Sequence, residues 1–214
     1  MVVSVCRRAR ESGATSIAVA TDDARIVHAV EQHGFRALVT SPTHASGTDR
    51  IAEAARTLGL VSQELIVNVQ GDEPRIQPDL IRAVADMLEH RPEASMSTAC
   101  HMVTDAELLS NPNVVKVVLD AQGHALYFSR SRIPYPRESG GQWYRHAGIY
   151  GFRAEFLQKY QTLPQSPLEK TESLEQLRVL WHGYKIAVVV REDEAEASVD
   201  SPQDLIHLIT VKKL

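Results

Sequence analysis

The chain holds 214 residues, of which 43% are hydrophobic and 23% charged, and its formal net charge is −4. This composition supplies a full hydrophobic core, and the lack of a long basic run disfavours nucleic-acid binding. No stretch approaches the roughly 20 apolar residues of a membrane span, and no signal peptide opens the sequence. Cys6 and Cys100 have neither metal-ligand nor CxxC spacing, which favours a reduced, cytoplasmic protein.

Helices and strands are expected to alternate through the first 40 residues. Apolar positions at helical spacing predict helices over Val2–Ser12 and Asp23–His33. Short apolar runs predict strands at Ser16–Ala20 and Arg36–Thr40. A strand, a helix and a strand of these lengths form a βαβ unit, so an α/β fold with a parallel sheet is expected.

The segment from Ser46 to Arg50 reads Ser-Gly-Thr-Asp-Arg and precedes a predicted helix over Ile51–Leu58. Small residues with free N–H groups at a helix N-terminus can bind an anion, and Arg50 would add a positive charge. A plain helix cap, with Ser46 or Thr48 as the capping residue, is the other interpretation. The sequence leaves both open.

The stretch from Leu65 to Pro74 organises the rest of the chain. An apolar, β-branched run ends in Gln70, Gly71 and Asp72, which predicts a buried strand opening into a turn. In open α/β sheets ligands bind beyond the carboxyl ends of strands, where Asp72 would offer a carboxylate to a hard cation such as Mg²⁺. Alternatively, Asp72 is an ordinary turn residue.

The second half of the chain departs from simple alternation. Strands at Val114–Asp120 and His124–Ser129 are joined by a short turn, which predicts an antiparallel hairpin extending the sheet. The loop from Arg130 to Gln142 carries three arginines and two prolines, as expected of a mobile loop or an oligomer contact. The other predicted elements are helix Pro78–His90, strand Ala94–Met102, helix Thr104–Leu109, strand Tyr144–Phe152, a helix containing Phe156 and ending at Pro164, helix Leu168–Trp181, strand Lys185–Arg191 and a terminal helix.

Three features near the C-terminus bear on function. A lone His146 on a strand is more often a hydrogen-bonded core residue than a catalytic one. The polar face of the helix Leu168–Trp181, with Glu172, Glu175 and Gln176, is expected to be solvated. Ser201 is a good N-cap for the terminal helix, so Asp200 is free to partner Asp72 in holding a metal ion.

Seven ordered motifs together resemble a known family. They are 46–50 SGTDR, 67–74 VNVQGDEP, 111–118 NPNVVKVV, 125–130 ALYFSR, 145–153 RHAGIYGFR, 174–180 LEQLRVL and 199–205 VDSPQDL. Across essentially its whole length the chain resembles the 3-deoxy-manno-octulosonate cytidylyltransferases, the CMP-Kdo synthetase family of the nucleotidyltransferase fold. The resemblance implies a single Rossmann-like domain over residues 1–214, with a mostly parallel sheet, helices on both faces and a smaller antiparallel dimerisation lobe around residues 111–153.

The resemblance also implies a reaction and the residues that serve it. CTP and 3-deoxy-manno-octulosonate (Kdo) would give CMP-Kdo and pyrophosphate for lipopolysaccharide synthesis, in a cytoplasmic homodimer that needs Mg²⁺ and contacts neither nucleic acid nor membrane. Asp72 and Asp200 match the metal ligands and are the expected catalytic residues. The positions around the acidic sugar match Gln70, Arg130, Arg137, His146, Tyr150, Glu175 and Gln176. The positions near the nucleotide match Thr21, Asp22, Ser46 and Arg50.

One departure from the family keeps alternatives open. Members begin with a strand and a Gly-, Arg- and Lys-containing loop around the triphosphate, whereas Met1 here aligns with the helix after that loop. A protein that binds a sugar acid or dimerises without turnover is therefore one alternative. A cytidylyltransferase for another 2-keto sugar acid is the other.

Overall fold

The structure is a computed structural model, and it describes residues 1–44, 46–103, 105–138, 141–193, 199, 203, 204 and 206. In this part of the chain no helix is both long and apolar enough to cross a membrane. The helices are α1 Val2–Glu11, α2 Ala24–Gln32, α3 Gly47–Thr57, α4 Pro78–His90, α5 Ala106–Ser110, α6 Ala154–Tyr160, α7 Pro167–Glu172 and α8 Gln176–Trp181. The strands are β1 Ala18–Thr21, β2 Arg36–Val39, β3 Leu65–Asn68, β4 Met96–Val103, β5 Lys116–Leu119, β6 Ala125–Ser129, β7 Trp143–Arg153 and β8 Ile186–Arg191.

The α/β class is confirmed, but the sheet is mixed rather than mostly parallel. β1 and β2 form a parallel pair of their own, and the larger sheet has the order β6-β5-β7-β4-β8, with β3 also pairing with β7. β7 is antiparallel to β3, β4 and β5, and within the larger sheet only β4 and β8 are parallel. Parallel neighbouring strands need a crossover connection, usually a helix. β7 follows a loop instead, so it can run antiparallel to its neighbours.

β7 is the longest strand and has a break along one edge. β3 pairs with residues 150–153 at one end, and β5 pairs with Tyr144 and Arg145 at the other, so neither strand pairs with residues 147–149. On the opposite edge the register with β4 shifts between Thr98 and Ala99, and the Thr98 hydroxyl donates to the carbonyl of Ile149 over 2.7 Å. This irregular stretch opens the sheet where the cavity described below lies.

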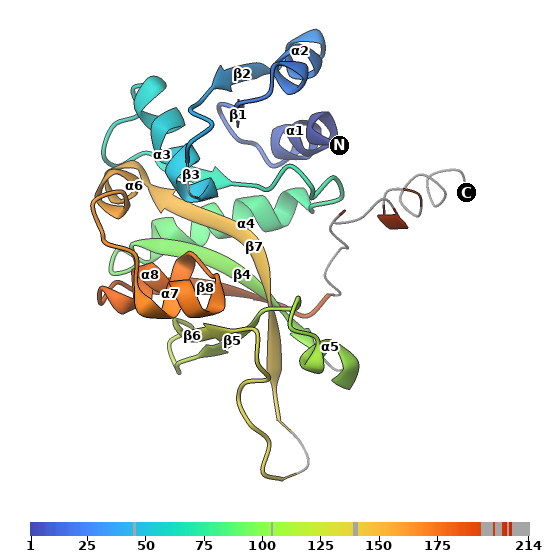
Figure 1. Cartoon of the computed structure of the whole chain (residues 1–214), viewed down its shortest axis with the longest axis vertical. Coiled ribbons are helices and arrows are strands. Elements are labelled where there is room, and N and C mark those ends of the chain that lie inside the picture. Colours follow the sequence, from blue (N-terminus) through green and yellow to red (C-terminus); the bar gives the residue numbers. More distant parts are fainter. Residues whose placement is uncertain are drawn as a thin grey trace.

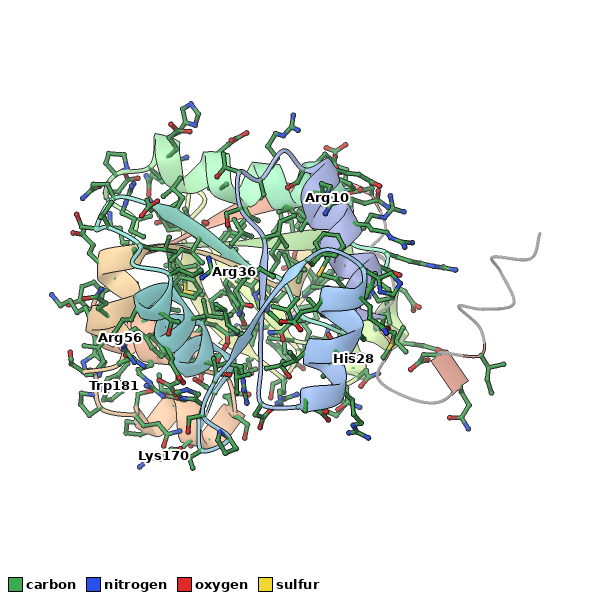
Figure 2. The ribbon with its side chains drawn as sticks, turned by 90° about the horizontal axis from the view of Figure 1, so that it is seen from above. Arg10, His28, Arg36, Arg56, Lys170 and Trp181 are labelled. Carbon is green, nitrogen blue, oxygen red and sulfur yellow. The ribbon has the colours of Figure 1, made fainter. Side chains whose placement is uncertain are left out.

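Helices cover both faces of the larger sheet. α4 packs Leu80, Ile81 and Val84 against Ala99 of β4 and Val189 of β8 in one apolar cluster. A second cluster holds aromatic and aliphatic side chains of β6, β7, α6 and α8, among them Phe128, Phe152, Leu157, Leu177 and Val179. Figure 1 shows β4 and β7 crossing the middle of the molecule, with the loop before β7 extending away from the sheet. Seen from above, α1 and α2 lie on one side, and α3 with α6 to α8 on the other (Figure 2).

The predicted helix Leu168–Trp181 is wrong, because the chain breaks at Ser173. Ser173 has a left-handed backbone with φ 54°, and it separates α7 from α8. A continuous helix would point Leu168 and Leu174 in directions about 120° apart, since each residue turns about 100°. The break lets α7 dock through a buried Glu169–Arg178 ion pair while Leu174 and Leu177 enter the core.

Candidate active site

A cavity of about 310 Å³ lies beyond the carboxyl end of β3, along the open edge of β7. Five of the residues predicted to form the site line it: Gln70, Asp72, His146, Tyr150 and Gln176. They come from the turn after β3, from β7 and from the start of α8. The fold therefore joins residues that are up to about a hundred positions apart in sequence.

Asp72 sits in the turn that follows β3, as expected of either interpretation of this residue. The amide of Glu73 donates to the Gln70 carbonyl, which closes the turn, and the Asp72 side chain lines the cavity. The amide of Val199 donates to the Asp72 carbonyl over 2.9 Å. Asp200, its predicted metal-binding partner, lies outside the described residues, as does Ser201, so the pairing of the two carboxylates stays a prediction.

The described residues contain no group of three or more His, Cys, Asp or Glu side chains arranged to hold a metal ion. A magnesium ion that keeps several waters needs only one or two protein carboxylates. Asp72 fits that requirement, because it lines the cavity. Val199, the residue before Asp200, lies against its backbone.

His146 is held between aromatic rings on the β7 wall. Its ring centroid lies 4.9 Å from that of Phe128 and 5.5 Å from that of Tyr150, and its Nε2 is 2.9 Å from the Thr98 hydroxyl. Burial lowers the pKa of His146 to about 3, so the imidazole is neutral at physiological pH. It can exchange hydrogen bonds with a sugar hydroxyl without adding charge.

Gln176 and Tyr150 form a polar pair on the same wall. The Tyr150 hydroxyl donates to Gln176 Oε1 over 3.2 Å, and burial raises the pKa of Tyr150 well above its usual value. Gln176 is only 2% exposed, and its Nε2 has no hydrogen-bond partner among the described residues. A buried amide donor left open in a cavity is costly without a ligand, so this wall is suited to a hydroxyl-rich molecule.

The expected solvated polar face of residues 172–176 is wrong. Glu172 accepts hydrogen bonds from the Ser129 hydroxyl over 2.6 Å and from the Arg130 amide over 3.0 Å. Burial raises the pKa of Glu175, while hydrogen bonds from Thr48 and Ser46 offset part of that shift. Because the helix breaks at Ser173, these side chains turn inward instead of facing water.

A second group of predicted residues lies at the carboxyl ends of β1 and β2. Arg50 Nη1 donates to the Thr40 hydroxyl over 2.6 Å and lies 3.4 Å from Asp22 Oδ1. Thr21 is buried, and its hydroxyl accepts a hydrogen bond from the Asp23 amide. Through Ser46 and Thr48, which reach Glu175, this group connects to the α8 end of the cavity.

The cap interpretation of the segment 46–50 is confirmed. The helix begins at Gly47, earlier than predicted, and the Ser46 hydroxyl accepts from the Asp49 amide over 3.2 Å. Residues 47–50 therefore form the first helical turn instead of a loop before it. The anion-binding interpretation stays a prediction.

The two predicted sugar-binding arginines, Arg130 and Arg137, do not line the cavity. Arg130 donates from Nε to the Glu172 carbonyl over 2.7 Å and from Nη1 to the Pro112 carbonyl over 3.1 Å. Arg137 is exposed in the loop before β7. Their contacts with a sugar acid stay predictions.

Sequence reasoning missed several polar residues of the cavity wall, four of which come from β4, β7, β8 and the residues just after β8. These four are His101 of β4, Arg145 of β7, Arg191 of β8 and Asp193 just after β8. Arg145 stood next to a predicted site residue, in the motif 145–153, and that position was the only available signal. The others are brought in by strand pairing, which the local sequence does not encode.

The cavity lies beyond a strand end of an α/β sheet, where ligands of Rossmann-like proteins bind. It has a carboxylate in the turn after that strand and a wall of groups that can bind hydroxyls. These features together define a nucleotide-dependent transferase of the Rossmann-like class. The chain belongs to the cytidylyltransferase family, whose sequence profile matches residues 1–186.

The comparisons with individual proteins agree with this family. Two proteins named 3-deoxy-manno-octulosonate cytidylyltransferase, from Acidovorax sp. (strain JS42) and Acidovorax ebreus (strain TPSY), are each 52% identical to this chain over 227 residues. Each match covers 99% of this chain and 87% of the relative. A solved structure of CMP:2-keto-3-deoxy-manno-octonic acid synthetase complexed with CTP is 37% identical, with a TM-score of 0.91 over 100% of this chain and 88% of that chain.

Proposed function

We propose that this protein transfers CMP from CTP to Kdo, giving CMP-Kdo and pyrophosphate for lipopolysaccharide synthesis. The observation that carries the proposal is the convergence of Gln70, Asp72, His146, Tyr150 and Gln176 on one cavity. The family and the names of its relatives at 52% identity support the same reaction and favour Kdo over other 2-keto sugar acids.

The residue types suit a transfer that requires positioning and charge neutralisation but no protein nucleophile. The anomeric hydroxyl of Kdo forms a bond to the α-phosphorus of CTP while the bond to pyrophosphate breaks, and the hydroxyl proton is released. Gln176 Nε2, the neutral His146 ring and the protonated Tyr150 hydroxyl hold the sugar hydroxyls. In the proposed complex Glu175 contributes to the sugar site, and the nucleotide lies near Thr21, Asp22, Ser46 and Arg50.

Mg²⁺ is the cofactor we propose, with Asp72 and Asp200 as its protein ligands. When bound, the ion supplies positive charge that offsets the repulsion between the phosphates and the sugar acid. The side chain of Asp72 lines the cavity, as such a ligand must. We also propose that the protein works in the cytoplasm, which agrees with two buried free cysteines.

We further propose a homodimer formed through the lobe of residues 111–153, centred on Tyr127–Trp143. Tyr135 in the loop before β7 is 82% exposed, and Leu126 on the edge strand β6 is 60% exposed. Apolar and aromatic side chains at the centre of a polar rim are typical of subunit interfaces. The loop is anchored at its base, because Trp143 Nε1 donates to the Pro134 carbonyl over 3.0 Å.

The test of the activity is pyrophosphate release by the purified chain with CTP and Mg²⁺, using Kdo and sialic acid in separate assays. We expect release with Kdo and little with sialic acid. Release with sialic acid but not Kdo would overturn the substrate assignment. Tight Kdo binding without any release would support the alternative of a binding protein without turnover.

A further inference from the structure

A row of basic side chains crosses the larger sheet at the cavity. Lys116 of β5 pairs with Arg145 of β7, Arg145 pairs with His101 of β4, and His101 pairs with Arg191 of β8. Directly paired residues project from the same face of a sheet, so all four side chains lie on one face. Like charges placed directly opposite one another are destabilising, so each cation in this row needs a compensating group.

Lys116 is compensated by backbone carbonyls. It is fully buried, and its Nζ donates to the carbonyls of Asn111 over 3.0 Å, Val114 over 2.5 Å and Arg130 over 2.5 Å. These three bonds use all three donors of an ammonium group. The lysine therefore holds together the segments before β5 and after β6, and it has no donor left for a ligand.

Arg191 and His101 are compensated by acidic and carbonyl groups at the other end of the row. Arg191 forms two hydrogen bonds of 2.9 Å with the Asp193 carboxylate, and its Nη1 lies 2.9 Å from Asp79 Oδ2. The His101 Nδ1 lies 2.8 Å from the Asp193 carbonyl oxygen and 3.7 Å from its carboxylate. The acidic charge at this end is thus matched to Arg191.

Arg145 differs from its three neighbours. Its side chain lines the cavity and is partly exposed there, and among the residues the structure describes it has no hydrogen bond or ion pair. It lies between two other basic positions, Lys116 and His101. A guanidinium between two basic positions without a partner is an unfavourable arrangement, and an anion in the cavity would relieve it.

We infer that Arg145 binds an anionic group of a substrate, through the paired N–H donors of its guanidinium. A carboxylate and a phosphate each present a pair of oxygens that this fork can bind, so the sugar acid and the nucleotide are the two sources of the group. The inference rests on the proposed function, because that function supplies both anions. It adds Arg145 to the substrate-binding residues, while the donors of Arg130 are engaged by carbonyls.

Calorimetric binding to the whole chain at constant ionic strength tests the inference. The ligands are Kdo and its neutral C1 carboxamide, and CTP and uncharged cytidine. The variants are wild type, Arg145→Met, Arg145→Lys and a control, Arg36→Met, which removes the same charge from an exposed position on β2. In wild type we expect each charged ligand to bind more tightly than its neutral counterpart.

Arg145→Met should reduce one of the two preferences, Kdo over its carboxamide or CTP over cytidine, by about 10- to 100-fold, the scale of a charge-assisted bidentate contact. The preference that falls identifies the source of the anionic group. Arg145→Lys keeps the charge without the fork, so it should fall between Met and wild type. Arg36→Met should retain both preferences, and Arg145→Met should melt no lower than wild type because a like-charge contact is removed.

Two outcomes would count against these ideas in different ways. If Arg145→Met and Arg145→Lys keep both wild-type preferences, another group binds the anions. The role of Arg145 is then overturned, while the proposed function stands. If wild type binds neither Kdo nor CTP, the proposed function is overturned, and the inference falls with it.

Discussion

The carbonyl of Asp72 accepts a hydrogen bond from the Val199 amide, and Asp72 lines the cavity. Asp72→Asn keeps the shape of the side chain but removes its charge. We expect turnover of CTP and Kdo to fall by at least about a hundredfold, the scale of losing a principal electrostatic stabiliser. The free energy of unfolding should change little, since among the described residues no ion pair to the Asp72 carboxylate is lost.

The matched control is Asp86→Asn, which removes the same charge from an exposed position of α4. Its turnover should stay within about twofold of wild type, because a surface substitution away from the site has a small effect. The turnover of wild type and both variants is compared from steady-state rates measured over a range of magnesium concentrations. Equal activity in Asp72→Asn and wild type would remove Asp72 from the metal site and return it to the role of a turn residue.

His146 gives a pH dependence of stability. Its pKa is lowered to about 3 in the folded chain, against about 6.5 when unfolded, so between these values the unfolded state binds the extra proton. The stability contributed by the neutral, buried ring is therefore complete above pH 6.5 and is lost as the pH falls. The loss between pH 6.5 and pH 5 should be on the order of 2 kcal/mol.

Urea unfolding at pH 7.5 and pH 5 measures this loss. His146→Gln should lose less stability than wild type over the interval, because no imidazole is then kept neutral by burial. His28→Gln is the control, since His28 is exposed on α2 (Figure 2) and should leave the wild-type loss intact. Equal losses in wild type and His146→Gln would show that the ring is solvated in the folded protein.

Single residues were predictable where their role is local. Asp72 closely follows an apolar run, and Ser46 precedes a helix in whose first turn it caps the Asp49 amide. Arg145 was not predictable, because its significance comes from its neighbours on β4 and β5, which only strand register determines. Gln176 was misjudged for a related reason, since a break in a predicted helix turned it inward.

At the scale of elements, Gly151 sets how closely α4 approaches β7. A Cβ added at this position would collide with Ser97 Oγ and lie 3.2 Å from the Val84 carbonyl oxygen. The same hydroxyl donates to that carbonyl over 2.7 Å, so a methyl group would disturb both the packing and this hydrogen bond. We expect Gly151→Ala to lower the free energy of unfolding by about 3 kcal/mol, as overpacking does.

Gly148→Ala is the control on the same strand, because the nearest atom to its added Cβ is Gln70 Cγ at 3.9 Å. Its stability in urea should stay within about 1 kcal/mol of wild type. Adding Ser97→Ala to Gly151→Ala should recover part of the loss, since one colliding atom is removed. No difference between the two glycine variants would mean that α4 moves away from β7 at little cost.

Most elements were predictable from periodicity, and the failures have local causes. The helix break at Ser173 required a left-handed residue that is neither glycine nor asparagine, which the sequence pattern did not indicate. The start of α3 was placed too late because residues 47–50 were read as a binding loop. Polar residues of the predicted site lie next to both the break at Ser173 and the start of α3. Tertiary contacts there override the secondary structure that the local sequence favours.

At the scale of the whole molecule, the α/β class followed from the succession of elements, but the sheet order did not. The βαβ unit of β1, α2 and β2 is parallel as predicted. β7 pairs with β3, β4 and β5, and the paired residues lie between 27 and 88 positions apart in sequence. Pairing between such distant segments depends on the packing of the entire sheet, so the local sequence pattern does not predict it.

Assembly is the prediction that belongs to this scale. Tyr135, 82% exposed, projects from a loop that Arg132 and Trp143 hold at its base, with the Arg132 guanidinium 4.9 Å from the Trp143 ring. We expect sedimentation at micromolar concentration to show a dimer, and Tyr135→Ser to weaken it at least about tenfold, as loss of a buried aromatic anchor does. Val61→Ser, at a 66% exposed site in a turn before β3, should leave the dimer intact. A monomer in wild type at micromolar concentration, or a dimer equally stable in Tyr135→Ser, would contradict an interface centred on this loop.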